Sequence, residues 1–80
     1  SSVWTVTREE LKKQFDFVLE KVEAGNSPVL IVADGKPDLL LFEWGDYWRR
    51  FGWCHKKGEK EEVEAEARRL YEEGLEPKQE

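Results

Sequence analysis

The stretch that decides the fold is PVLIVADGKPDLLLF, residues 28–42. It contains two continuous apolar runs, residues 29–33 and residues 39–42, and each run predicts a strand. Between them lies DGKP, residues 34–37, which begins with the Asp-Gly pair that tight hairpin turns prefer. The segment therefore predicts a β-hairpin. Neither run alternates with polar side chains, so we expect both faces of the hairpin to be covered.

An amphipathic helix is predicted immediately before the hairpin, over residues 7–24. Thr7 and Glu10 have the spacing of a capping box, and Gly25 is expected to end the helix as a left-handed cap. A helix of this length spans about 27 Å, which is too little to cover both faces of the hairpin. Its apolar side is formed at helical spacing by Leu11, Phe15, Val18, Leu19 and Val22.

These elements predict a small α/β (α+β) domain. Residues 3–6 add a short β-like run, so we expect a small antiparallel sheet in which the hairpin packs against helices. The uncovered face of that sheet requires another helix or a second copy of the chain. We therefore expect association with protein, and a homodimer in particular.

A second helix is predicted over residues 43–52, and its aromatic residues allow two interpretations. In the first they complete the hydrophobic core. In the second they form a protein-binding patch, because Trp, Tyr and Arg dominate interface energetics. Arg49, Arg50 and Trp53 project from other sides of this helix and favour a patch. The aromatic residues that share one side are Trp44, Tyr47, Trp48 and Phe51.

The rest of the chain is predicted to be an extension. Residues 1–53 form the dimerisation domain, residues 54–60 form a polar linker, residues 61–75 form an amphipathic helix, and residues 76–80 form a disordered tail. The helix is either a solvated extension or a segment that orders against another protein. Its narrow apolar stripe consists of Val63, Ala67, Leu70 and Tyr71.

Size and charge restrict the class of function. Eighty residues make one domain with a thin margin of core burial, which dimerisation commonly supplements. The net charge is -5, and acidic residues outnumber basic ones in both residues 1–53 and residues 54–80. Such a chain lacks the basic body that phosphate binding favours, although a dimer can build a local basic patch.

No enzyme is predicted. Cys54 and His55 are adjacent on the chain and supply two ligands, whereas a structural metal site takes about four. The DGK segment lacks the glycine-rich frame of a phosphate loop. We expect no cofactor. One cysteine excludes an internal disulfide and favours a reducing cytoplasm, and no apolar run reaches membrane-spanning length.

Several short motifs occur together in one order along the chain. They are Thr5-Val6-Thr7, Phe15, Val22-Glu23-Ala24-Gly25, Pro28-Val29, Gly35-Lys36-Pro37 and Asp46-Tyr47. In order and spacing they resemble the Phd/YefM family of bacterial antitoxins, over about residues 3–50. The resemblance implies an α/β homodimer whose amino-terminal domain binds operator DNA, and a carboxy-terminal segment that wraps and neutralises a toxin, often a ribonuclease.

The resemblance also implies where these activities lie. It places the dimer and DNA surface around Thr5, Thr7, Lys12 and Lys13, and it assigns toxin capture to the apolar stripe of residues 61–75. The chain departs from the family where Leu11-Lys12 replaces a frequent Ala-Arg pair, because lysine lacks the bidentate fork of arginine.

Three hypotheses follow. The chain is a natural antitoxin, or a scaffold of this family remade to bind an unrelated target, or a DNA-binding regulator without a toxin. The second hypothesis is motivated by the absence of methionine, by Phe17 at a position that is usually polar, and by the second helix, which is rich in Trp and Arg. Its contact surface would consist of Phe17, Trp44, Trp48, Arg49, Arg50 and Trp53.

Overall fold

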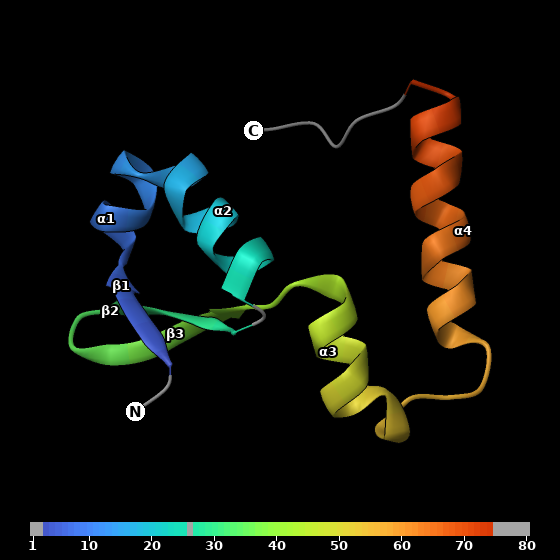
Figure 1. The fold of residues 1–80 in the computed structure, drawn as a ribbon, viewed down its shortest axis with the longest axis horizontal. Helices are drawn as coiled ribbons and strands as arrows, with labels where there is room; N and C mark the ends of the chain where they lie inside the picture. Colours follow the sequence, from blue (N-terminus) through green and yellow to red (C-terminus); the bar gives the residue numbers. More distant parts are fainter. Residues whose placement is uncertain (1–2, 26, 75–80) are drawn as a thin grey trace. The chain divides into compact units, whose positions relative to one another are not determined.

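The structure is a computed structural model that describes residues 3–25 and 27–74 (Figure 1). It is a mixed α+β fold, and the chain divides between Arg50 and Phe51 into two compact units. The elements in chain order are β1 (Trp4–Thr7), α1 (Arg8–Lys13), α2 (Phe15–Gly25), β2 (Val29–Ala33), β3 (Lys36–Leu41), α3 (Trp44–Phe51), the 3-10 turn η1 (Gly52–Cys54) and α4 (Glu59–Glu72).

The first unit contains a three-stranded sheet in the order β1-β2-β3. β2 and β3 are antiparallel, as the hairpin predicts, but β1 pairs with β2 in the parallel direction. The expectation of an antiparallel sheet is therefore wrong. The reason is the connection: the chain leaves β1, crosses through α1 and α2, and re-enters the sheet in its original direction (Figure 1).

The hairpin turn is confirmed. Asp34 has a φ of 53° and Gly35 a φ of 74°, which is the pair of left-handed residues that a tight type I′ turn requires. The register then shifts, because Ile31 lies opposite Leu39 whereas Val32 lies opposite Pro37. Asp38 is thus an extra residue in β3, and a shift of this kind bends and twists the strand locally.

The helix predicted over residues 7–24 is interrupted. Thr7 does form the capping box: its hydroxyl accepts from the Glu10 amide at 3.0 Å, and the Glu10 carboxylate accepts from the Thr7 amide at 2.9 Å. At Gln14 the backbone leaves the helical region, with φ -126° and ψ 39°, so α1 and α2 are separate helices. A single non-helical residue thus changes the direction of the second helix. Because neither Pro nor Gly marks this position, the periodicity of the apolar residues does not reveal the break.

The hydrophobic core lies between α2 and the sheet and is entirely aliphatic. Its fully buried members are Val6, Val18, Val22, Val29 and Ile31, with Trp4, Leu11 and Leu41 packed against them.

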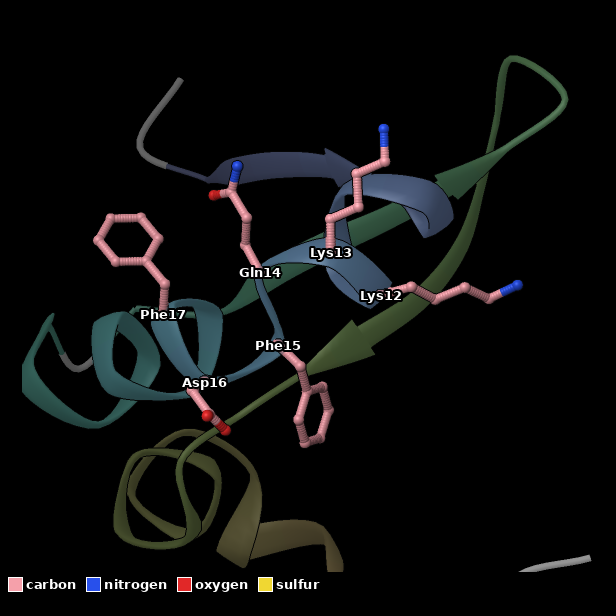
Figure 2. Close-up of a pocket in the computed structure, with 6 residues that line it drawn as sticks. All are labelled: Lys12, Lys13, Gln14, Phe15, Asp16 and Phe17. Carbon is pink, nitrogen blue, oxygen red and sulfur yellow. The ribbon is translucent and has the colours of Figure 1, made fainter.

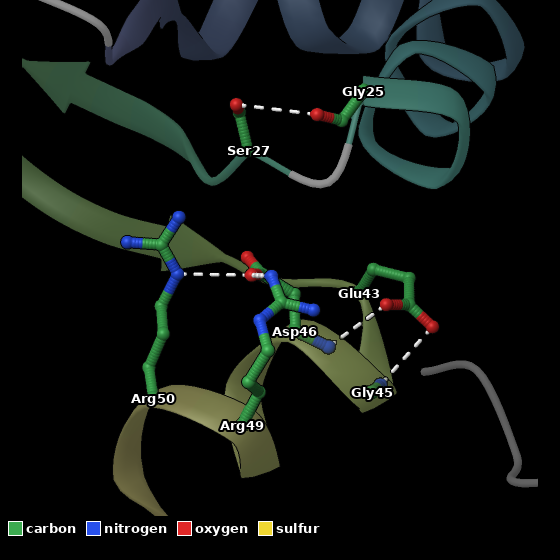
Figure 3. Close-up of polar contacts among 7 residues, drawn as sticks. All are labelled: Gly25, Ser27, Glu43, Gly45, Asp46, Arg49 and Arg50. Carbon is green, nitrogen blue, oxygen red and sulfur yellow. Dashed lines mark hydrogen bonds and ion pairs between the residues drawn. The ribbon is translucent and has the colours of Figure 1, made fainter.

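Two details of the predicted helix are wrong. Phe15 is about half exposed rather than part of the core, because the break at Gln14 changes the phase of the helical face. Gly25 is the last residue of α2 and is not left-handed, since the glycines with positive φ among the described residues are Gly35, Gly58 and Gly74. The Gly25 carbonyl instead accepts a hydrogen bond from the Ser27 hydroxyl at 3.3 Å (Figure 3).

β3 is the poorly covered edge of the sheet. Leu39 and Leu40 point to opposite faces of the strand, and they are 53% and 56% exposed. Residues 39–42 were expected to be covered on both faces. The described part of this chain does not supply that cover over Leu39 and Leu40.

The aromatic side chains of α3 do not complete the core, so the first interpretation of this helix is wrong. Trp44 is exposed, and Tyr47 and Trp48 are half-buried outside the aliphatic cluster. The fully buried residue of α3 is the charged Asp46.

The second unit consists of η1, a short connection and α4. α4 begins at Glu59, two residues before the predicted helix and inside the predicted linker of residues 54–60. It ends at Glu72, whereas the helix was predicted to reach residue 75. The predicted tail, residues 76–80, and residue 75 lie outside the described residues. None of the described residues 51–74 is buried.

Candidate protein-binding surfaces

The first candidate surface is the apolar stripe of α4. Val63, Ala67, Leu70 and Tyr71 follow one another at spacings that place them on the same side of a helix. Val63 is 45% exposed, Tyr71 is 87% exposed, and Leu70 is half-buried. An amphipathic helix that leaves its apolar side in water has the form of a helix that binds a groove on another protein.

The remainder of α4 is acidic and internally paired. The helix contains six acidic and three basic residues. Arg69 pairs with Glu66 in one turn and with Glu73 at 3.0 Å in the next, and the hydrogen bond from Arg69 lowers the pKa of the Glu66 carboxyl. Lys60 lies 4.0 Å from Glu64. Pairs at these spacings stabilise a helix modestly without any core.

The start of α4 is organised by Glu59. Its carboxylate lies 2.8 Å from Nδ1 of His55 and accepts from the Lys56 amide at 3.3 Å. These hydrogen bonds, the one to His55 first, lower the pKa of the Glu59 carboxyl. Cys54 instead donates its thiol to the Phe51 carbonyl at 3.0 Å. The adjacent Cys54 and His55 thus contact different groups.

The second candidate surface is a row of aromatic rings that includes the first turns of α3. Trp44 and Trp48 meet with ring centroids 5.5 Å apart, Tyr47 lies 5.6 Å from Trp48, and Phe42 lies 5.7 Å from Tyr47. All three contacts are edge-to-face, which is a favourable arrangement of aromatic quadrupoles. We call residues Phe42, Trp44, Tyr47 and Trp48 the aromatic row.

Two arginines flank the aromatic row. Arg49 and Arg50 both bind the same oxygen of the buried Asp46, Arg50 through Nε at 2.9 Å (Figure 3). The Glu43 carboxylate caps the helix by accepting from the Gly45 amide at 3.0 Å and the Asp46 amide at 2.8 Å. Asp46 was not predicted as a functional residue, although its spacing of three and four residues from the arginines is a recognisable signal.

Phe17, a further member of the predicted patch, has contacts of its own. Phe17 packs edge-on against Trp4, with ring centroids 6.1 Å apart. The Lys21 ammonium lies 5.6 Å from the centroid of the Trp4 ring and 5.8 Å from that of the Phe17 ring. Trp53 is 83% exposed and belongs to the second unit. Sequence reasoning missed Trp4 and Lys21, although Phe17 and Lys21 have helical i,i+4 spacing.

The residues implied to contact DNA do not form an assembled phosphate site. The Thr7 hydroxyl is engaged in the capping box, and Thr5 bonds the Val3 carbonyl at 3.5 Å. Lys12 and Lys13 project in different directions beside a shallow hollow of about 640 Å³ (Figure 2). That hollow is lined by Lys12, Lys13, Gln14, Phe15, Asp16 and Phe17.

Within the described residues, no three His, Cys, Asp or Glu side chains gather where they could hold a metal ion. No described helix combines the length and the apolar composition that crossing a bilayer requires. Comparisons with protein-family models, with curated proteins and with solved structures found no match to this chain.

Proposed function

We propose that this chain is a non-enzymatic protein-binding module of the Phd/YefM antitoxin type. Its α4 captures and inhibits a partner protein, and its first unit associates as a homodimer. The observation that carries the proposal is the open apolar stripe of α4, on a helix whose charged side is predominantly acidic. A toxin with a basic groove, such as a ribonuclease, has the complementary surface.

The dimer is supported by the state of β3. An exposed strand with two leucines half in water is normally covered in a native protein, since edge strands and apolar patches promote association. A second copy would cover Leu39 and Leu40 symmetrically. Sedimentation equilibrium tests this: Leu40→Lys should shift the chain towards monomer, and a chain that is already monomeric at micromolar concentration would contradict the dimer.

Partner capture is tested with a charge placed in the stripe. The intact chain and a Leu70→Glu variant are immobilised and exposed to lysate of the source cell, and retained proteins are identified and purified. We expect a protein whose ribonuclease activity falls stoichiometrically on adding the intact chain, and falls at least tenfold less effectively with Leu70→Glu.

The matched control is Glu62→Gln, which changes an exposed charge of α4 outside the stripe. It should retain full capture. Capture and inhibition that survive both Leu70→Glu and removal of residues 59–80 would reject the antitoxin proposal.

A second function is favoured by the aromatic row and its two arginines. Trp and Arg are among the residue types most enriched at interface hot spots, and here both guanidiniums pair with one buried carboxylate. In this alternative the chain is an engineered binder or inhibitor whose remade surface includes α3, without DNA binding. Trp44→Ala or Arg49→Ala should then abolish partner binding, and α4 should be dispensable.

A further inference from the structure

The contact of Trp4, Phe17 and Lys21 lies at the edge of the sheet opposite to β3. We call these three residues the Trp–Phe–Lys cluster. β1 is an edge strand, so its outer backbone groups have no neighbouring strand in the described residues. Trp4 is the first residue of that strand, and Phe17 and Lys21 project from α2. Next to the cluster is a hollow of about 260 Å³, lined by Trp4, Lys21, Gly25, Ser27 and Val29.

The Lys21 ammonium gives the cluster a positive charge. Lys21 forms no ion pair with a carboxylate anywhere in residues 3–25 and 27–74. Its ammonium instead lies over two aromatic rings, which is a weaker interaction than a desolvated ion pair. Phe17 is half exposed beside it. An apolar wall, an ammonium group and an open strand edge are therefore adjacent.

We propose that the edge of β1 binds an extended acidic peptide segment, which adds to the sheet as a fourth strand. Main-chain hydrogen bonds to β1 would supply affinity, as in other cases of strand addition. The peptide residue opposite Trp4 would lie on the same face as Trp4, because paired residues in neighbouring strands share a face. A glutamate at that position would meet Lys21, with its methylene groups against Phe17.

Two other occupants fit less well. A second copy pairing β1 with β1 would bring the residues VWTVT, which include no carboxylate for Lys21. Nucleic acid would offer phosphate to Lys21, but it has no row of main-chain N–H and C=O groups that could pair with the open edge of β1. The acidic peptide satisfies both the strand edge and the lysine. This proposal concerns a surface separate from α4 and does not depend on the proposed function.

The test is an NMR titration of the full isotope-labelled chain with a terminally blocked hexapeptide, Thr-Val-Glu-Val-Glu-Thr. We expect shifts at the amides of residues 4–7 and at the Trp4 indole. The same peptide with glutamine in place of both glutamates should bind at least tenfold more weakly, because one charge-assisted contact is worth about a factor of ten.

Variants separate binding from folding. Lys21→Gln should weaken binding of the acidic peptide about tenfold, whereas Lys36→Gln, an equal charge change at the hairpin, should leave it unchanged. Both lysines are exposed, so an unchanged denaturation midpoint verifies that each variant is folded. Equal binding of the two peptides, shifts at β3 in place of β1, or no effect of Lys21→Gln would overturn the proposal. Tighter binding of a short oligothymidylate at the same residues would overturn it as well.

Discussion

The two compact units of this chain are stabilised in different ways. The first unit buries five aliphatic side chains between a helix and a sheet, whereas the described part of the second buries none. α4 depends on ion pairs along its own surface and on its terminal hydrogen bonds. Isolated helices of this length are marginal in water. The comparison teaches that the first unit has a hydrophobic core of its own, whereas α4 in the second unit leaves its apolar side exposed.

The largest expected effect is on the core of the first unit. Val18 is 1% exposed and lies at the centre of the aliphatic cluster. Val18→Ala removes two methyl groups from close packing and should lower the free energy of unfolding by roughly 2 kcal/mol, measured by urea denaturation. The matched substitution Val63→Ala in α4 should change it by less than about 0.5 kcal/mol. If the two substitutions lower the free energy of unfolding equally, the units do not differ in core packing as described.

The next effect concerns the hairpin turn. Gly35 has a φ of 74°, which strains any residue with a Cβ. Gly35→Ala should therefore lower the free energy of unfolding by about 1–2 kcal/mol. Gly25→Ala is the control, since that glycine is helical with open space around it. A stabilising or neutral Gly35→Ala would mean that the turn differs from the one described.

A smaller effect is expected at the start of α1. Thr7→Ala removes the acceptor for the Glu10 amide and should cost about 1 kcal/mol of unfolding free energy. Thr7→Ser keeps the acceptor and should restore most of the loss. Thr5→Ala, at an exposed position of the same strand, should have little effect. If Thr7→Ser is as destabilising as Thr7→Ala, the capping hydrogen bond is not the cause.

The smallest effect is a pH dependence confined to α4. The pKa of the Glu59 carboxyl is lowered in the folded helix. The ionised carboxylate therefore stabilises the first turn of α4 at pH values above the ordinary pKa of 4.5, and this stabilisation disappears as the pH falls through the lowered pKa. Carbon chemical shifts of residues 59–62 should report fraying of the first turn in acid. In Glu59→Gln the turn should already be frayed at pH 7, and this part of the acid transition should vanish. An unchanged acid transition in that variant would contradict the assignment.

Local patterns were sufficient for several elements. The strand β2, the turn at Asp34-Gly35 and the capping box at Thr7 were predicted correctly, because each depends on neighbouring residues alone. The second strand of the hairpin was predicted over residues 39–42, but β3 begins at Lys36 and ends at Leu41, because the tight turn uses only Asp34 and Gly35 and leaves Lys36 and Pro37 to pair with β2. The interruption at Gln14 was not, since no Pro or Gly marks it and the change of direction is fixed by packing of α2 onto the sheet. The same interruption moved Phe15 out of the predicted core.

The candidate surfaces were predicted in part. The stripe of α4 follows from helical spacing, which the structure reproduces. The patch around α3 was predicted by composition, but its parts were separated: Phe17 joined Trp4 and Lys21, and the arginines turned onto Asp46. Side-chain contacts between residues 13 or 17 positions apart depend on how β1 and α2 meet, which no local pattern contains.

The amino-acid sequence by itself determined the hairpin turn, the capping box at the start of α1 and the amphipathic side of α4, because these are set by interactions a few residues apart. The tertiary structure alone decided the parallel pairing of β1, the exposure of Leu39 and Leu40, and the burial of Asp46. Those features depend on which elements meet in space, and burial is a property of the assembled layers rather than of any residue type.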